Sequence, residues 1–154
     1  MISELWHQGK RKELQHILNL AARGIFAFTL PVSLIMVIFG KQVLALFGSE
    51  FTVAYGPLVI LAAGQIVNSL AGVVGLIMNM TGHQNNLFII VGICVSLNIL
   101  LSIILIPVFG IYGAALSVSC SLIAWNALMF IYVLKILKLN PCILSIGEFK
   151  QEKF

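Results

Sequence analysis

The chain has 154 residues, of which 60% are hydrophobic and only 9% are charged, and its formal net charge is +4. A soluble domain carries about 25% charged residues, and a core of this size cannot hide so much apolar side chain from water. The composition therefore excludes an ordinary soluble domain and favours a protein of the lipid bilayer, since no Asp, Glu, Lys or Arg occurs between Phe51 and Leu134.

Residues 1–23 are predicted to form an amphipathic helix on the cytoplasmic side or in the membrane interface. One helical face carries the apolar residues Leu14, Ile17, Leu18 and Ala21. Lysine, arginine and glutamine residues supply the polar side, and a basic amphipathic helix with a tryptophan fits the interface of a bilayer. The alternative is that this segment folds onto the rest of the protein.

Four long apolar runs follow and predict four transmembrane helices. These spans cover about residues 24–47, 54–80, 87–107 and 112–138, and a cytoplasmic tail follows over residues 139–154. Each run is long enough for a hydrocarbon core of about 30 Å, which needs about 20 residues. The connections are short, so helices that are neighbours in sequence are expected to pack antiparallel. The predicted fold class is all-α integral membrane, with four transmembrane helices and an N-terminal amphipathic helix.

Basic residues flank the apolar region on both sides. They precede the first span and follow the last one, and Lys41 is the single basic residue between Arg23 and Lys135. Cytoplasmic segments carry an excess of Lys and Arg, and four spans place both ends of the chain on one side. Both termini are therefore predicted to be cytoplasmic. Because the basic residues flank apolar spans and form no aromatic–basic platform, no nucleic-acid partner is expected.

No catalytic or metal-binding constellation is recognisable in the sequence. His7, His16 and His83 fall in predicted interfaces or loops, without metal-ligand spacing or an acidic partner. The cysteines are odd in number and fit no metal-site spacing, and no Gly-rich phosphate loop, nucleophile elbow or zinc motif occurs. The protein is therefore not expected to be an enzyme, and no cofactor and no metal site are expected.

Small and polar residues inside the predicted spans are the most informative ones. The candidates for helix packing are Gly64, Gly72, Gly75, Gly113, Ser117 and Ser121. The candidates for the wall of a polar substrate cavity are the amide side chains of Gln65, Asn68, Asn79 and Asn98. Small residues let membrane helices approach closely, and buried amides bond across helices. Helix packing alone and a polar cavity are therefore both open interpretations of this pattern.

Three segments and one intramembrane residue occur in an order that is typical of one known family. The segments are Leu46–Ala54 after a proline-bearing span, Met80–Gln84 at the end of the next span, and Ile106–Ala115, which follows Asn98. The last segment, an Ile-Pro pair before a Gly-x-x-Gly-Ala-Ala turn, is the most specific. Over roughly residues 1–138 the chain resembles the C-terminal part of the polysaccharide-biosynthesis flippases, the O-antigen-type flippases of lipid-linked oligosaccharides in the MATE-like flippase superfamily.

The resemblance implies a transporter that moves lipid-linked polysaccharide precursors across a bacterial inner membrane by alternating access, without covalent chemistry. Members of this family have about a dozen or more spans, in two pseudo-symmetric bundles around a central cavity. This chain is then expected to be the last part of such a protein, as a fragment or a split gene product. The implied partners are membrane lipid, lipid-linked oligosaccharide, and either the missing N-terminal transmembrane helices or further copies of the chain.

Two alternatives remain open at this point. An exporter of drugs or organic cations from the same superfamily would need acidic residues in its spans for coupling, and no ionisable side chain lies deep in a predicted span. A small non-transporting membrane protein that assembles with a partner or with itself is the other alternative.

Overall fold

The computed structural model describes residues 11–71 and 73–137, and every regular element in these residues is helical. The elements are α2 (Arg11–Ala45), the 3-10 helix η1 (Ser49–Ala54), α3 (Tyr55–Leu70), α4 (Val74–Met80), α5 (Gln84–Phe109), α6 (Ile111–Tyr132) and the π-helical turn η2 (Val133–Leu137).

In the described part of the chain, four stretches are long and apolar enough to cross a membrane. They are His16–Ala45, Ser49–Leu70, Gln84–Phe109 and Ile111–Ile136. At about 1.5 Å of rise per helical residue, each of them reaches across a hydrocarbon core of about 30 Å. The predicted all-α membrane fold with four transmembrane helices is therefore confirmed, and the chain is a multi-pass membrane protein.

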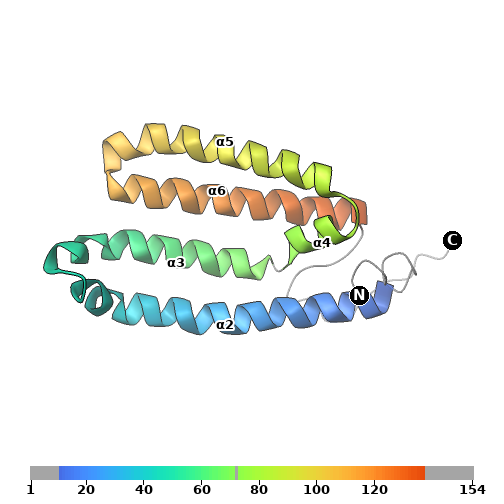
Figure 1. The fold of residues 1–154 in the computed structure, drawn as a ribbon, viewed down its shortest axis with the longest axis horizontal. Helices are drawn as coiled ribbons and strands as arrows, with labels where there is room; N and C mark the ends of the chain where they lie inside the picture. The colour runs from blue at the N-terminus through green and yellow to red at the C-terminus, as the bar shows by residue number, and fades with distance from the viewer. Residues whose placement is uncertain (1–10, 72, 138–154) are drawn as a thin grey trace.

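The transmembrane helices form an open row, in which α2 packs along α3, α3 along α6, and α6 along α5 (Figure 1). The two helices of each hairpin, α2–α3 and α5–α6, run in opposite directions, whereas α3 and α6 run in the same direction. Antiparallel packing of sequence neighbours therefore holds within both hairpins. The successive transmembrane helices α3 and α5 do not pack on each other, because the chain passes through α4 and enters α5 on the far side of α6.

The order of the row determines which helices are shielded by protein. In the apolar window of the α6 span 33% of the residues are buried inside the protein, against 6% in the α5 span. The α5 helix is an edge of the row and exposes isoleucine, leucine and valine side chains along most of its length. In a bilayer such a surface needs no cover from protein, since lipid tails are as apolar as these side chains.

The segment predicted as an interfacial helix continues without a break into the first span, because α2 is one helix from Arg11 to Ala45. Leu14 and Leu18 are 0% and 1% exposed and belong to a buried cluster with side chains of α4 and α6. The described part of the segment is thus helical, as predicted, and its apolar face packs onto the rest of the protein. Residues 1–10 lie outside the described residues, as does the predicted tail over residues 139–154.

The hydrophobic core lies at the end of the row where α2 begins and α6 ends. Its buried members are Leu14, Leu18, Val73, Val74, Ile77, Met78, Met129 and Val133. Two helix ends and the short helix α4 meet in this cluster, so it ties together parts of the row that are not direct neighbours.

The second predicted span, residues 54–80, differs from the structure. Helix α3 ends at Leu70 and the chain becomes helical again only at Val74. Gly72, a predicted packing residue between them, lies outside the described residues. Glycine is less favourable than alanine in a helix interior by about 1 kcal/mol, and the break lets the apolar side chains of α4 enter the core. The stretch that is long and apolar enough to cross a membrane is therefore Ser49–Leu70, and α4 lies outside it.

We expect Leu18→Ala to lower the thermal stability of the protein in detergent by several degrees. Leu18 is fully buried in the core, and removal of a buried leucine side chain costs about 2–5 kcal/mol because a cavity remains. The matched control is Leu20→Ala on the same helix, since Leu20 is 66% exposed. Equal melting temperatures for the two variants would show that α2 does not pack on α4 and α6 through this face.

Candidate functional site

A chain of three amide side chains crosses the boundary between α3 and α6. Asn126 of α6 donates from Nδ2 to Oδ1 of Asn68 at 2.7 Å and also to the carbonyl oxygen of Leu122 at 2.8 Å. Asn68 in turn donates from its own Nδ2 to Oε1 of Gln65 at 3.0 Å. Asn126 is buried, Asn68 is half-buried and Gln65 is exposed. We call these three residues the amide seam.

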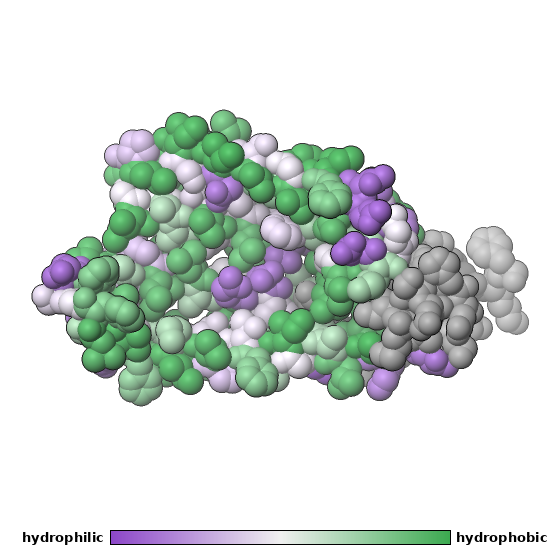
Figure 2. Space-filling view, viewed as in Figure 1, coloured by the Kyte–Doolittle hydropathy of each residue, from purple (hydrophilic) through white to green (hydrophobic). Residues whose placement is uncertain are grey.

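The amide seam lies near the middle of the row. Figure 2 shows a hydrophilic patch at the centre of the molecular face, surrounded by apolar surface. Gln65 and Asn68 lie in the last two turns of α3. A polar group without a partner is costly in hydrocarbon. Asn126 and Asn68 lower this cost by hydrogen bonding to each other. The amide of Gln65 is exposed, so it is the end of the seam that a further molecule can reach.

Small residues allow α3 and α6 to approach beside the amide seam. A Cβ atom on Gly64 would lie 3.0 Å from Oγ and 3.2 Å from Cβ of Ser119. The Ser119 hydroxyl donates to the carbonyl oxygen of Ile60 at 3.2 Å. Gly64 therefore lies at a helix–helix contact, as the packing interpretation expects, and its partner Ser119 is a residue that the sequence analysis did not select.

The contact between α5 and α6 is also made by a glycine and by serine hydroxyls. A Cβ atom on Gly113 would meet the backbone carbonyl of Leu105, so only glycine fits at this position. The hydroxyls of Ser117 and Ser102 are 2.9 Å apart across the two helices, and Ser121 donates to the carbonyl oxygen of Ser117 at 2.8 Å. The three predicted packing residues of α6 therefore lie on the side that faces its neighbours, and all three are buried.

The structure separates the other predicted candidates from the amide seam. Asn79 is exposed on α4, and Asn98 is half-buried on α5, which is divided from α3 by α6. Gly75 has ordinary contacts only, with Met129 Sδ 3.7 Å from a Cβ placed on it. Of the four predicted amides, the structure brings together Gln65 and Asn68 alone, and it adds Asn126 to them.

The spacing between Asn126 and Ser119 is the feature of the sequence that could have indicated Asn126 as a contact residue. The two residues are seven positions apart, which is about two turns of helix, so they lie on one face of α6. That face meets α3 through both residues. The selected stripe of Gly113, Ser117 and Ser121 faces α5 at Ser117, which bonds to Ser102.

A second polar cluster fixes the turn between α4 and α5 to the end of α6. His83 Nδ1 lies 3.0 Å from the carbonyl oxygen and 3.2 Å from the hydroxyl oxygen of Thr81, and Asn86 donates to the Tyr132 hydroxyl. The rings of His83 and Tyr132 pack edge to face with centroids 5.8 Å apart. The buried Thr81 hydroxyl donates to the carbonyl oxygen of Ile77 at 2.8 Å. These contacts hold the turn in place.

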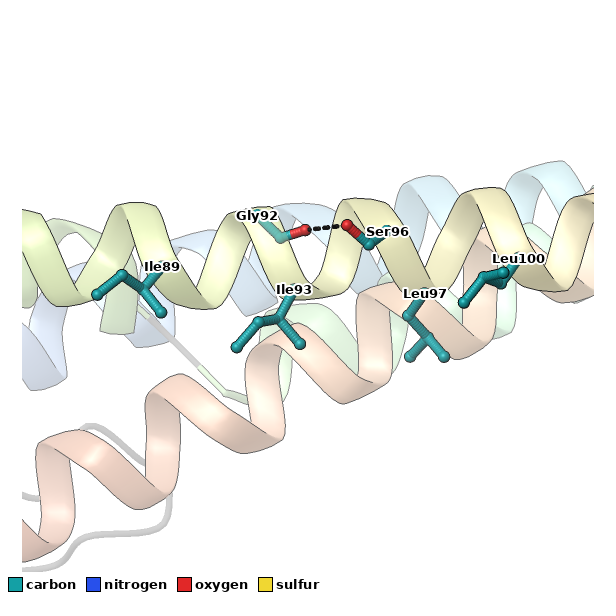
Figure 3. Close-up of a pocket in the computed structure, with 6 residues that line it drawn as sticks. All are labelled: Ile89, Gly92, Ile93, Ser96, Leu97 and Leu100. Atoms are coloured by element: carbon teal, nitrogen blue, oxygen red, sulfur yellow. Dashed lines mark hydrogen bonds between the residues drawn. The ribbon is translucent and has the colours of Figure 1, made fainter.

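A shallow apolar groove runs along α5 (Figure 3). Its lining residues are Ile89, Gly92, Ile93, Ser96, Leu97 and Leu100. Ser96, the polar side chain in this set, donates to the carbonyl oxygen of Gly92 in its own helix at 2.9 Å, so it has little capacity for a ligand. The groove has the character of a lipid-facing helix surface and is chemically unlike the amide seam.

The described residues contain no group of three or more histidine, cysteine or acidic side chains that could hold a metal ion. No family model matches the chain, and no curated protein or solved structure matches it. The chain is thus a multi-pass membrane protein whose two central helices, α3 and α6, carry uncharged amides within their spans.

Proposed function

We propose that this chain is part of a bacterial inner-membrane flippase for lipid-linked polysaccharide precursors, and that it contributes one wall of the path of the glycan. In this proposal no bond is made or broken. The protein lowers the barrier for a polar headgroup to cross the hydrocarbon, while the lipid tail of the same molecule stays in the bilayer.

The observation that carries the proposal is the amide seam with its exposed end at Gln65. A glycan offers many hydroxyl groups, each of which donates and accepts hydrogen bonds. A primary amide also does both, so neutral amides match this substrate without the cost of moving a charge into the membrane. An exporter of organic cations would be expected to place carboxylates here, and the sequence from Phe51 to Leu134 has none.

We also propose that further helices complete the path of the glycan, and the open row of helices supports this. Gln65 is exposed and accepts a hydrogen bond from Asn68 of its own helix, and an amide exposed to lipid tails would lack further partners. Other transmembrane helices or further copies of this chain therefore cover that face and leave a polar space between them.

We expect this chain, expressed alone in a flippase-deficient strain, to restore no surface polysaccharide.

The arrangement of the ends also fits the proposed orientation. The first turn of α2 and the last turn of α6 lie at the same end of the row (Figure 1). Basic residues cluster near both of these ends in the sequence. In the proposed topology this end faces the cytoplasm, in line with the excess of basic residues in cytoplasmic segments.

Photo-cross-linking from position 65 in the native membrane tests the proposal. A photoreactive amino acid replaces Gln65 in cells whose glycan precursors carry a radioactive sugar. We expect label to transfer to the protein from position 65, because a passing glycan comes within contact distance there. The matched control places the same photoreactive residue at Ile103 of α5, which is 66% exposed on the edge helix and should capture ordinary phospholipid without the sugar.

Capture of phospholipid alone from both positions would contradict a role in glycan transport. Capture of protein alone from position 65 would favour the non-transporting alternative, in which the amide seam is an assembly surface.

A further inference from the structure

The turn between α2 and α3, together with the last residues of α2 and the short helix η1, carries large apolar side chains on its outer surface. We call residues 42–54 the apolar cap. Its exposed members, with their exposed fractions, are Leu46 85%, Phe47 73%, Phe51 49% and Val53 64%. Leu46 is the most exposed of the large hydrophobic residues in the described part of the chain. Such a surface in water would be unfavourable, so the position of the cap relative to the bilayer decides its role.

Contacts between helices place the starts of α3 and α6 beside one level of α2 at this end of the row. The Tyr55 hydroxyl donates to the carbonyl oxygen of Val37 at 2.7 Å, which sets the start of α3 beside residues 37–40 of α2. A Cβ atom on Gly56 would meet the ring of Tyr112, so the start of α6 lies at the same level. Tyrosine is enriched at membrane interfaces, and Lys41 is placed to reach the headgroups.

The apolar cap extends past this level. From Gly40 to Ala45 the helix rises about 7–8 Å at about 1.5 Å per residue, and Figure 1 shows the turn with η1 projecting beyond the turn between α5 and α6. The polar headgroup layer is about 5–8 Å thick on each side of the hydrocarbon core. The cap therefore begins next to Lys41 and has dimensions that fit within the headgroup layer.

The backbone of the cap is built to turn back toward the membrane. Gly48 has a φ of 136°, which an L side chain rarely adopts, and it directly precedes η1. The Thr52 hydroxyl donates to the carbonyl oxygen of Ser49 at 2.7 Å inside the short helix. A glycine-dependent reversal followed by a compact helix holds the apolar residues as a fixed surface.

We propose that the apolar cap is an interfacial anchor, which inserts Leu46 and Phe47 at the boundary between headgroups and acyl chains of the leaflet opposite the Arg11 end of α2. The partner is the lipid surface itself. Lys41 and Glu50 are the charged residues of this region and balance each other, so the anchor binds through apolar contact and does not select anionic lipids. The inference goes beyond the proposed transport function and is independent of it.

Depth-dependent fluorescence quenching tests the anchor. Phe47→Trp is made in a background in which both native tryptophans are phenylalanine, and the full chain is placed in vesicles of zwitterionic lipid. We expect blue-shifted emission that is lost most strongly with a quencher near the headgroup end of the acyl chain and weakly with aqueous iodide. Adding anionic lipid should leave both results unchanged. Val95→Trp, in the middle of α5 and 51% exposed, is the matched control and should respond most to a quencher deep in the chain.

Each other outcome overturns the inference. Strong quenching by iodide at position 47 would place the cap in water, and protection from iodide and from every lipid quencher would mean that protein covers it. A response that appears only with anionic lipid would mean that charge drives the contact. Phe47→Tyr guards against a folding defect, since a tyrosine there should keep the melting temperature.

Discussion

Replacing Gly113 by leucine is expected to destroy the α5–α6 hairpin. A Cβ atom at this position would collide with the backbone carbonyl of Leu105, and a helix backbone cannot move aside as a flexible side chain can. Overpacking a tight site costs about 1–3 kcal/mol and more where the backbone has to shift. That cost is a large share of the 5–15 kcal/mol that typically holds a domain together. We expect aggregation on size-exclusion chromatography in detergent and no cooperative melting.

The control for this prediction lies on the same hairpin. Gly92 of α5 has open space around it, with no atom within 4 Å of a Cβ placed there, so Gly92→Leu should leave the protein monodisperse. Similar losses in both variants would mean that α5 and α6 are not as close as the structure shows.

Replacing Asn68 by leucine is expected to reduce surface polysaccharide about tenfold or more in the source organism while the protein stays folded. Asn68 is the middle residue of the amide seam, and the substitution removes both the acceptor for Asn126 and the donor to Gln65. Hydrogen bonds between membrane helices contribute on average about 0.6 kcal/mol. The loss of folding free energy is thus small, whereas under the proposed function the glycan would lose the ordered amides on its path.

The comparison of two asparagines separates a role in transport from a general effect of removing an amide. Asn98→Leu changes an amide that is half-buried on α5 and outside the seam, so it should preserve surface polysaccharide. Protein abundance and melting temperature are measured for both variants. Full transport with Asn68→Leu would refute the assignment of the seam to the glycan path.

The sequence is sufficient to predict which segments cross the membrane, because long uncharged apolar runs have few other stable solutions. It also predicts Gly64, Gly113 and Ser117 as contact residues, since small residues at helical spacing favour close packing in membranes. The order of the helices in the row does not follow from these patterns. The apolar residues that dominate α5 do not specify which neighbour it meets. The pairing of α3 with α6 rests on contacts between residues about 58 positions apart.

The end of α3 at Leu70 and the start of α4 at Val74 explain why the polar residues predicted for one helical face lie on two separate helices. Asn79 shares a helical face with Asn68 only if the helix continues through residues 71–73, and the structure ends α3 at Leu70. Helix propensity alone gives a weak preference for the break. The burial of the α4 side chains among Leu14 and Met129 is a tertiary effect that appears only when distant segments meet.

The arrangement of two hairpins joined through α3 and α6 has a consequence for biogenesis. Each hairpin is made of helices that follow one another within a few residues, so its halves can associate as soon as both have entered the bilayer. The amide bond from Asn126 to Asn68 cannot form until α6, the last of the four spans, has been inserted. We therefore expect the two hairpins to be the early units of assembly, with docking between them as the final step. Until that step, Asn68 lacks the hydrogen bond from Asn126, and the polar edge of the first hairpin is left without its partner helix.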